Sequence, residues 1–271
     1  MTKIALLPYR GVVTLTGPDR VAFLNGLVSN DVEKAGPGQA VWAALLTPQG
    51  KYLVDFFVFS DESQLFLDLP RDVIPDLIKK LSRFRLRAKV EITDASGDFK
   101  TYAIWQGIPS SSPLTAMDPR LPGAGYRSLS TQDVACNATL HDYAAHRIVL
   151  GLPDGPPDLE PEKTLLLEAG FDELNGIDWQ KGCYMGQELT ARTKYRGLVK
   201  RRLLPVTLSQ PNLPAGASIL ANEQEVGSLR SVEGTNGLAM IHLSALAQPL
   251  TVSGSDLSVQ IPSWVRQKGL T

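Results

Sequence analysis

A lysine, a cysteine and two glycines lie together at residues 181–188, which read Lys-Gly-Cys-Tyr-Met-Gly-Gln-Glu. A nearby ammonium group and backbone N–H groups lower the pKa of a thiol, and the thiolate is the form that attacks electrophiles and binds metal ions. Gly182 and Gly186 leave space around the sulfur and permit backbone angles that other residues resist. We therefore interpret Cys183 as a candidate reactive thiol and Lys181 as its candidate activator. The alternative is a buried cysteine that acts as a small apolar residue beside a glycine turn.

A basic segment follows the cysteine closely. Residues 192–202 contain six lysine or arginine residues and no acid. The net charge of the whole chain is only −1, so the positive charge is local and is not that of a protein that binds nucleic acid or a membrane along its whole surface. We therefore expect any anion binding to be local to this segment. We do not expect nucleic acid or a membrane as the partner.

The composition, with 43% hydrophobic and 20% charged residues, is that of an ordinary soluble globular protein. Cys136 and Cys183 are far apart and form no CxxC pair, and the N-terminus has no apolar stretch long enough for a secretory signal. We therefore expect two free thiols in a reducing, cytoplasmic compartment. His141, His146 and His242 do not combine with the cysteines at the spacing of a zinc site, so we expect no stable metal site.

The order of apolar segments indicates an α+β or split βαβ body at residues 1–199 and a second domain at residues 200–271. In the first part we predict strands at 11–16, 41–46, 52–59, 64–69, 89–93 and 101–106, and helices after Pro18, at 74–84 and from Asp142. Residues 107–125 are rich in proline and predict a surface loop. Past residue 200, strands at 203–208, 218–220, 226–232, 238–243 and 250–261 predict a small β-barrel or sandwich.

Two polar features interrupt the apolar pattern. Asp55 lies within the apolar strand at 52–59, where a buried carboxylate is costly unless it is paired. It therefore faces either solvent or a functional site. Ser29, Asn30 and Asp31 end the first helix, where their side chains either bond to the backbone of a turn or reach into a pocket.

The cysteine segment and the residues after it resemble the signature of the YgfZ-type folate-binding proteins. Mitochondrial relatives of those proteins assist iron–sulfur cluster assembly, and the wider group includes the T-protein (aminomethyltransferase) of the glycine cleavage system. Residues 17–31, 143–153 and 167–177 resemble other parts of the family, and the similarity is weakest at 95–135 and past 210. Residues 188–192 are similar to the mitochondrial branch in particular. The signature positions besides Lys181 and Cys183 are Gly182, Tyr184, Gly186, Gln187, Glu188, Arg192 and Arg196.

The resemblance implies a T-protein-like body of two interlocked halves, each of sheet and helix, followed by a C-terminal β-barrel. It also implies that tetrahydrofolate, or a related folate, binds in a central cavity. The implied folate contacts are Tyr143, Arg147, Asn30, Asp31, Asp55 and Glu168. Each has a structural alternative, such as a core aromatic for Tyr143, an ion pair for Arg147 and a helix cap for Glu168. T-proteins carry two adjacent acids where this chain has Val54 and Asp55, and they lack the cysteine signature, so aminomethyl transfer is in doubt.

Three hypotheses for the function follow. The first is an accessory protein for iron–sulfur enzymes in which Cys183 is essential and transiently ligates iron or a cluster, or accepts an electron or sulfur. Stable clusters take about four protein ligands, so an assembly or client protein, or the mate of a weak dimer, would supply the others. The second is a folate-dependent one-carbon transferase or demethylase that uses Asp55. The third is a role associated with tRNA modification through residues 192–202. We favour the first.

Overall fold

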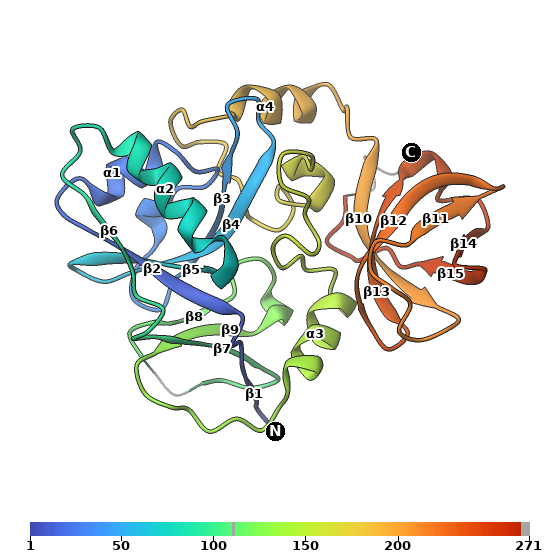
Figure 1. Ribbon diagram of the computed structural model, residues 1–271, viewed down its shortest axis with the longest axis horizontal. Helices are drawn as coiled ribbons and strands as arrows, with labels where there is room; N and C mark the ends of the chain where they lie inside the picture. Colours follow the sequence, from blue (N-terminus) through green and yellow to red (C-terminus); the bar gives the residue numbers. More distant parts are fainter. Residues whose placement is uncertain (110–111, 267–271) are drawn as a thin grey trace.

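Within residues 1–109 and 112–266, which the computed structural model describes, the chain forms two antiparallel sheets, a closed barrel and four α-helices (Figure 1). The larger sheet has five strands in the order β3-β4-β5-β2-β6. Their bounds are β2 Arg10–Thr16, β3 Val41–Leu46, β4 Tyr52–Ser60, β5 Gln64–Pro70 and β6 Glu91–Asp94. These strands agree closely with the predicted ones, because each is a continuous or alternating apolar segment that ends at a turn.

The smaller sheet joins the N-terminus to the middle of the chain. Its order is β1-β7-β9-β8, with bounds β1 Lys3–Leu6, β7 Lys100–Trp105, β9 Tyr126–Ser130 and β8 Thr115–Met117. Because β1 lies in this sheet and β2 lies in the larger one, the N-terminal segment interlocks the two halves of the body. The predicted loop at 107–125 is wrong in part, since it contains β8, a three-residue edge strand paired with β9. Part of that predicted loop, residues 110 and 111, lies outside the described residues.

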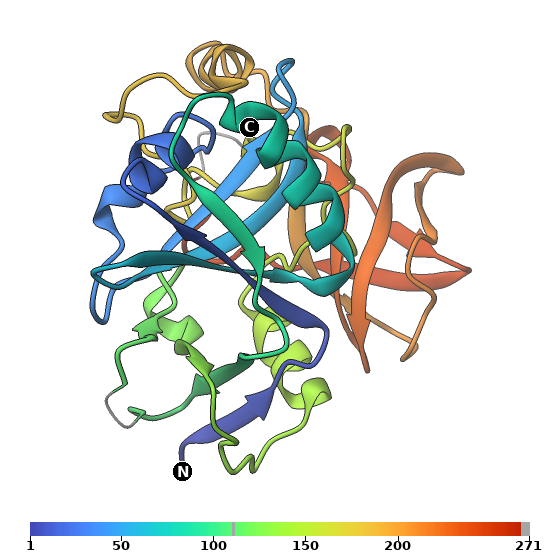
Figure 2. The same ribbon diagram turned by 60° about the vertical axis from the view of Figure 1, so that its left-hand side comes forward.

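Four helices cover the body. They are α1 Arg20–Asn25, α2 Ile74–Arg85, α3 Leu140–Val149 and α4 Gln187–Tyr195. Ile74, Leu77 and Leu81 are buried and lie at helical spacing, so α2 packs this face onto the larger sheet, as Figure 2 shows. The other face of that sheet contributes Val12, Trp42 and Phe57 to a second core. The described residues include no helix that is long and apolar enough to cross a membrane.

The C-terminal strands close into a barrel in the order β10-β13-β12-β11-β14-β15. Their bounds are β10 Arg201–Leu208, β11 Ser218–Ala221, β12 Gln224–Glu233, β13 Asn236–His242, β14 Leu250–Val252 and β15 Ser255–Val259. The single strand predicted at 250–261 is wrong, because residues 253 and 254 form a turn that divides it into two antiparallel strands. Helix α3 packs against β12 and β13 and so joins the barrel to the body.

Candidate functional site

Cys183 lies in a surface loop between a well-packed lead-in and helix α4. In the lead-in, the ring of Phe171 stacks on Trp42 with ring centroids 3.9 Å apart. On the other side of the cysteine, Tyr184 is buried, and burial raises the pKa of its phenol to about 12. Gly182 and Cys183 between these anchors are both exposed. The loop is therefore fixed on both sides and presents the thiol to solvent. Cys183 is not a buried core residue, and its reactivity stays a prediction.

The ammonium group of Lys181 is directed at backbone oxygens that follow helix α1. Its Nζ donates to the carbonyl oxygens of Asn25 at 2.7 Å, Val28 at 2.8 Å and Asn30 at 2.6 Å, and to Asn25 Oδ1 at 2.9 Å. Burial lowers the pKa of Lys181 to about 8, so the group is still charged at neutral pH. These hydrogen bonds join the thiol loop to residues 151 to 156 positions earlier in the chain. The predicted activation of the thiol by Lys181 remains untested.

Gly186 fixes the start of helix α4 against the turn between β3 and β4. Its φ angle is +81°, and a Cβ atom there would lie 2.6 Å from the carbonyl oxygen of Thr47 and 2.9 Å from the Cα atom of Gly50. Only glycine fits at position 186 without a shift of the backbone, because any side chain would collide with this turn. Gly182 differs, because a Cβ atom there would have no neighbour within 4 Å.

The six cations of residues 192–202 divide into two groups. Three are paired with acids of the body: Lys194 Nζ lies 3.1 Å from Asp172, Arg201 Nη2 lies 3.1 Å from Glu168 and Arg202 Nη2 lies 2.7 Å from Glu173. The other three, Arg192, Arg196 and Lys200, are exposed and have no ion-pair partner among the described residues. Tyr195 lies between them and is 77% exposed.

A cleft of about 630 Å³ opens at the lead-in to the thiol loop. Its polar lining includes Asn30, Lys34, Asn175 and Asp178, and Trp179 provides an aromatic face. Asp178 Oδ1 accepts hydrogen bonds from the backbone N–H groups of residues 180 and 181 at 2.7 and 3.0 Å, while Oδ2 is paired with Lys34. The volume is in the range of small-molecule sites, about 300 to 1,000 Å³.

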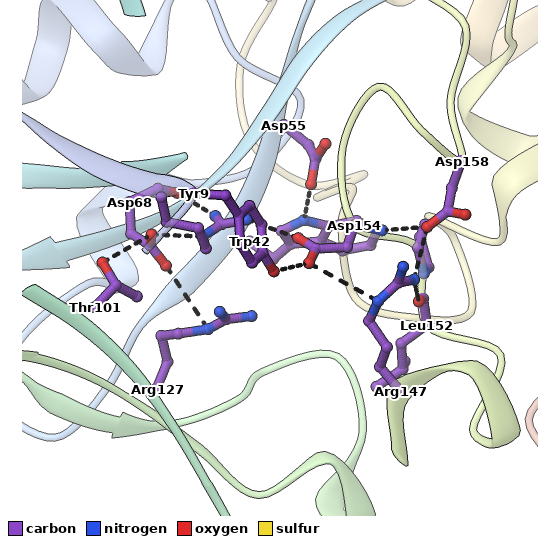
Figure 3. A network of polar contacts seen from close by, with 12 residues as sticks. Tyr9, Trp42, Asp55, Asp68, Thr101, Arg127, Arg147, Leu152, Asp154 and Asp158 are labelled. Atoms are coloured by element: carbon purple, nitrogen blue, oxygen red, sulfur yellow. Dashed lines mark hydrogen bonds and ion pairs between the residues drawn. The ribbon is translucent and has the colours of Figure 1, made fainter. Parts of the chain in front are cut away.

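A network of buried ion pairs joins both sheets to helix α3 and the loop that follows it (Figure 3). Arg10 Nε lies 2.6 Å from Asp68 Oδ1, and Arg10 Nη1 lies 2.7 Å from Asp154 Oδ1. Arg147 Nη1 lies 2.7 Å from Asp158 Oδ2. Burial alone would raise the pKa of Asp154, but the guanidinium groups of Arg10 and Arg147 outweigh it and hold that pKa well below its usual range. The network is therefore charged and internally paired.

Comparison with known proteins decides the family. A family model described as CAF17, C-terminal beta-barrel domain, matches residues 200–267. The mitochondrial iron–sulfur cluster assembly factors IBA57 of Homo sapiens and Mus musculus are each 31% identical to this chain, over 94% of its length and 83% of theirs. The chain belongs to the IBA57 family. A homologue of IBA57 from Mycosarcoma maydis is 36% identical over 80% of this chain, which spans 60% of that protein's length.

The fold is that of the T-protein. The structure of the glycine cleavage system aminomethyltransferase T from Bartonella henselae superimposes with a TM-score of 0.76, over 97% of this chain and 86% of that one, at 14% identity. This comparison and the closed barrel confirm the predicted T-protein-like body with a C-terminal barrel. They also agree with the resemblance to the YgfZ-type proteins, to which the IBA57 family is related.

The predicted cytoplasmic location is wrong, because the IBA57 relatives are named as mitochondrial proteins. The expectation rested on free thiols and on the sequence of the N-terminus. Unpaired thiols distinguish a reducing compartment from an oxidising one, but they do not identify which reducing compartment it is. Cys136 and Cys183 are both free in the structure, so the thiols themselves are as expected.

Three predicted folate contacts use their polar atoms within the protein and lie away from the cleft. The hydroxyl of Tyr143 accepts a hydrogen bond from Arg127 Nη2 at 2.8 Å. Arg147 belongs to the buried network and also donates to Ser231 Oγ in β12 at 2.7 Å. Glu168 is paired with Arg201 and accepts a hydrogen bond from the N–H group of Leu165. Their role toward folate stays a prediction.

The other three predicted contacts are closer to the larger sheet. Asp55 is 2% exposed and accepts hydrogen bonds from Trp42 Nε1 at 2.9 Å and Tyr52 Oη at 2.7 Å, and burial raises its pKa. Asp31 caps a short 3-10 helix by accepting from the N–H group of Glu33. Asn30 does line the cleft, where its amide group donates to the carbonyl oxygens of Trp42 and Asn175.

Sequence reasoning missed the residues that line the cleft with Asn30. Lys34, Asn175, Asp178 and Trp179 come from segments about 140 residues apart. The available signal was the Asp178-Trp179 pair directly before the cysteine signature, an acid and an aromatic in a segment without periodicity. No group of three or more histidine, cysteine or acidic side chains within the described residues is arranged to hold a metal ion.

Proposed function

We propose that this protein acts in the assembly or repair of iron–sulfur clusters and that Cys183 is its essential thiol. The observation that carries the proposal is the exposed position of Cys183 in a loop fixed on both sides, in a member of the IBA57 family. In this role the thiol loses its proton to solvent and the sulfur forms a bond with iron of the cluster, which is the cargo. The bond breaks again when the cluster moves on.

A partner must complete the coordination of the cluster, because one thiolate is about a quarter of the protein ligands that a stable cluster takes. The exposed face of α4 is the proposed contact. The helix begins four residues after Cys183 and carries Arg192 and Tyr195; Arg196 caps its end, and Leu198 beyond it is 46% exposed. Arginine and tyrosine are enriched among residues that dominate binding energy at interfaces. The unpaired cations favour a partner with an acidic surface.

Tetrahydrofolate, or a related folate, is the proposed ligand of the cleft. The cleft has room for it, Trp179 and Ile177 offer apolar faces to a pterin ring, and the Asp178 carboxylate suits the ring's N–H donors. Lys34 is 62% exposed along its side chain and is able to leave Asp178 for the carboxylate tail of the ligand. We expect folate binding to fix the side of the cleft formed by Asp178 and Trp179, which precede the thiol loop in the chain.

The test uses the two exposed cysteines as a matched pair. In cells that lack their own family member, wild-type protein and Cys136→Ala are expected to restore the activity of a cluster-dependent enzyme, whereas Cys183→Ala is not. Full rescue by Cys183→Ala would overturn the role of the thiol. Arg192→Glu with Arg196→Glu should also lose rescue, while Arg83→Glu with Arg87→Glu, an equal charge change on exposed residues near the end of α2, should keep it.

Folate binding is tested separately by calorimetry with tetrahydrofolate. Wild-type protein and Cys183→Ala are expected to bind equally, and Lys34→Ala several-fold more weakly, while Lys163→Ala on the outer surface serves as the control. The absence of binding to the wild type would remove the folate proposal and leave the thiol proposal in place. A transferase that uses Asp55 is not favoured, because an acid–base group must reach its substrate and Asp55 is buried away from the cleft.

A further inference from the structure

The ammonium group of Lys181 occupies a cage of oxygen atoms. The carbonyl oxygens of Asn25, Val28 and Asn30 lie 2.7, 2.8 and 2.6 Å from Nζ, and Asn25 Oδ1 lies 2.9 Å from it. An ammonium group carries three hydrogens, so the four oxygens surround it as they would surround a small monovalent cation. Asn25 is the last residue of α1, and the final carbonyl groups of a helix have no partner within the helix.

The cage is held in place by contacts that do not involve Lys181. Val28 forms a β-bridge with Leu45, and the N–H group of Ser29 donates to the carbonyl oxygen of Ala44 at 2.9 Å. Asn25 Oδ1 also accepts a hydrogen bond from the N–H group of Val32 at 3.1 Å. The oxygens are therefore preorganised by the larger sheet and by the turn after α1.

We propose that Lys181 is a positioning residue whose ammonium group acts as a tethered cation in this cage and so fixes the loop that presents Cys183. The backbone of Lys181 is held as well, because its N–H group donates to Asp178 Oδ1 at 3.0 Å. Only Gly182 separates this anchored residue from the thiol. The importance of that position rests on the proposed function of Cys183, whereas the cage itself does not.

The cage also connects the thiol loop to the cleft. Asn30 supplies one cage oxygen and lines the cleft, and Asp178 holds the loop backbone and lines the same cleft. Both anchors of the loop therefore belong to one wall. A change in that wall is transmitted to Cys183 through two short contacts.

The test is the mobility of a nitroxide spin label attached to Cys183 in a Cys136→Ala background. Lys181→Ala opens the cage, and we expect the label to become more mobile than in the parent protein. Ammonium or potassium chloride should restore the restricted spectrum, because either ion fits a cage built for an ammonium group. Tetramethylammonium chloride at the same ionic strength is too large and should not. Lys163→Ala, which removes an exposed lysine, should behave as the parent.

Each outcome bears on the proposal. A label that is equally restricted in Lys181→Ala would overturn it. A mobile label that does not respond to ammonium or potassium would also overturn it, since packing of the lysine stem would then hold the loop. Lys181→Met keeps the length of the stem without its charge and should resemble Lys181→Ala.

A measurement on the unaltered side chain covers the case in which Lys181→Ala does not fold. In protein with ¹⁵N-labelled lysine, the hydrogens of the Lys181 ammonium group should exchange with solvent more slowly than those of Lys163. Equal rates would contradict the cage. Full rescue of cells by Cys183→Ala would remove only the proposed function, whereas an unresponsive label would remove only the cage.

Discussion

Charged residues differ in their partners between two regions of this molecule. In the buried network, Asp68 and Asp154 are each paired with Arg10, and all three side chains are almost fully shielded from solvent. On α4 and directly after it, Arg192 and Arg196 are exposed and have no ion-pair partner among the described residues. Through Arg127 and Arg147 the first region also connects the larger sheet with the smaller sheet and the barrel, and the second leaves its charges available near the thiol. Residue type alone therefore does not identify a functional residue. Whether a charged side chain is already paired within the protein is the more useful criterion.

The largest effect is expected from breaking the network at Asp154. Asp154→Ala leaves the guanidinium group of Arg10 buried without one of its two carboxylate partners. Removal of one partner of a buried ion pair costs about 3 to 5 kcal/mol. We expect a loss of that size in the free energy of unfolding, measured with urea. Asp133→Ala, which removes an exposed ion pair with Lys100, should leave the midpoint unchanged. Equal effects would mean that the network does not stabilise the fold.

Acid should act on Asp154 and on a second buried ion pair, in which Arg120 Nη2 lies 2.7 Å from Asp118 Oδ2. The pKa values of Asp154 and Asp118 are below the usual aspartate value of 3.8, because nearby arginines outweigh the effect of burial. A carboxyl group whose pKa is lowered in the folded protein contributes stability above its unfolded pKa and loses it as the pH falls further. The free energy of unfolding, measured with urea, should therefore decrease as the pH falls below 3.8, by up to roughly 1.4 kcal/mol per pH unit for each such group. Asp118→Asn should make this fall shallower, and an unchanged slope would contradict the assignment.

A smaller effect separates the scaffold of the thiol loop from its exposed surface. Gly186→Ala places a Cβ atom 2.6 Å from the carbonyl oxygen of Thr47 at a φ angle of +81°. The left-handed conformation costs a non-glycine residue about 1 to 3 kcal/mol, and the close contact adds to it. Gly197→Ala is the control, because its φ angle is +62° and no atom lies within 4 Å of the new Cβ. Thermal unfolding should show the larger loss for Gly186→Ala, and the reverse order would mean that the contact with Thr47 relaxes.

The sequence predicted the elements of the fold better than the contacts of the site. The strand at 41–46 and the helix from 74 follow from local apolar patterns, and the structure contains both. Strands β1 and β8 are short and lack such a pattern, so only pairing with β7 and β9 defines them. The site depends on contacts between distant segments. Arg10 meets a carboxylate 144 residues away, and Lys181 bonds to carbonyl oxygens 151 to 156 residues away although Cys183 is its neighbour in sequence.

The smallest effect on stability, and the sharpest test of the comparison, is expected at Gly182. It is exposed, and its Cβ position has no neighbour within 4 Å, so the fold gives no steric reason for a glycine there. Gly182→Val should change the free energy of unfolding by no more than about 0.5 kcal/mol, as is usual for surface substitutions. We nevertheless expect it to reduce rescue of a cluster-dependent enzyme, because the valine side chain would stand beside the sulfur where a partner must approach. Unfolding in urea and rescue in cells measure the two effects independently. Full rescue by Gly182→Val would show that a partner reaches Cys183 without close contact to the loop backbone, and loss of stability would place Gly182 with Gly186 in the scaffold.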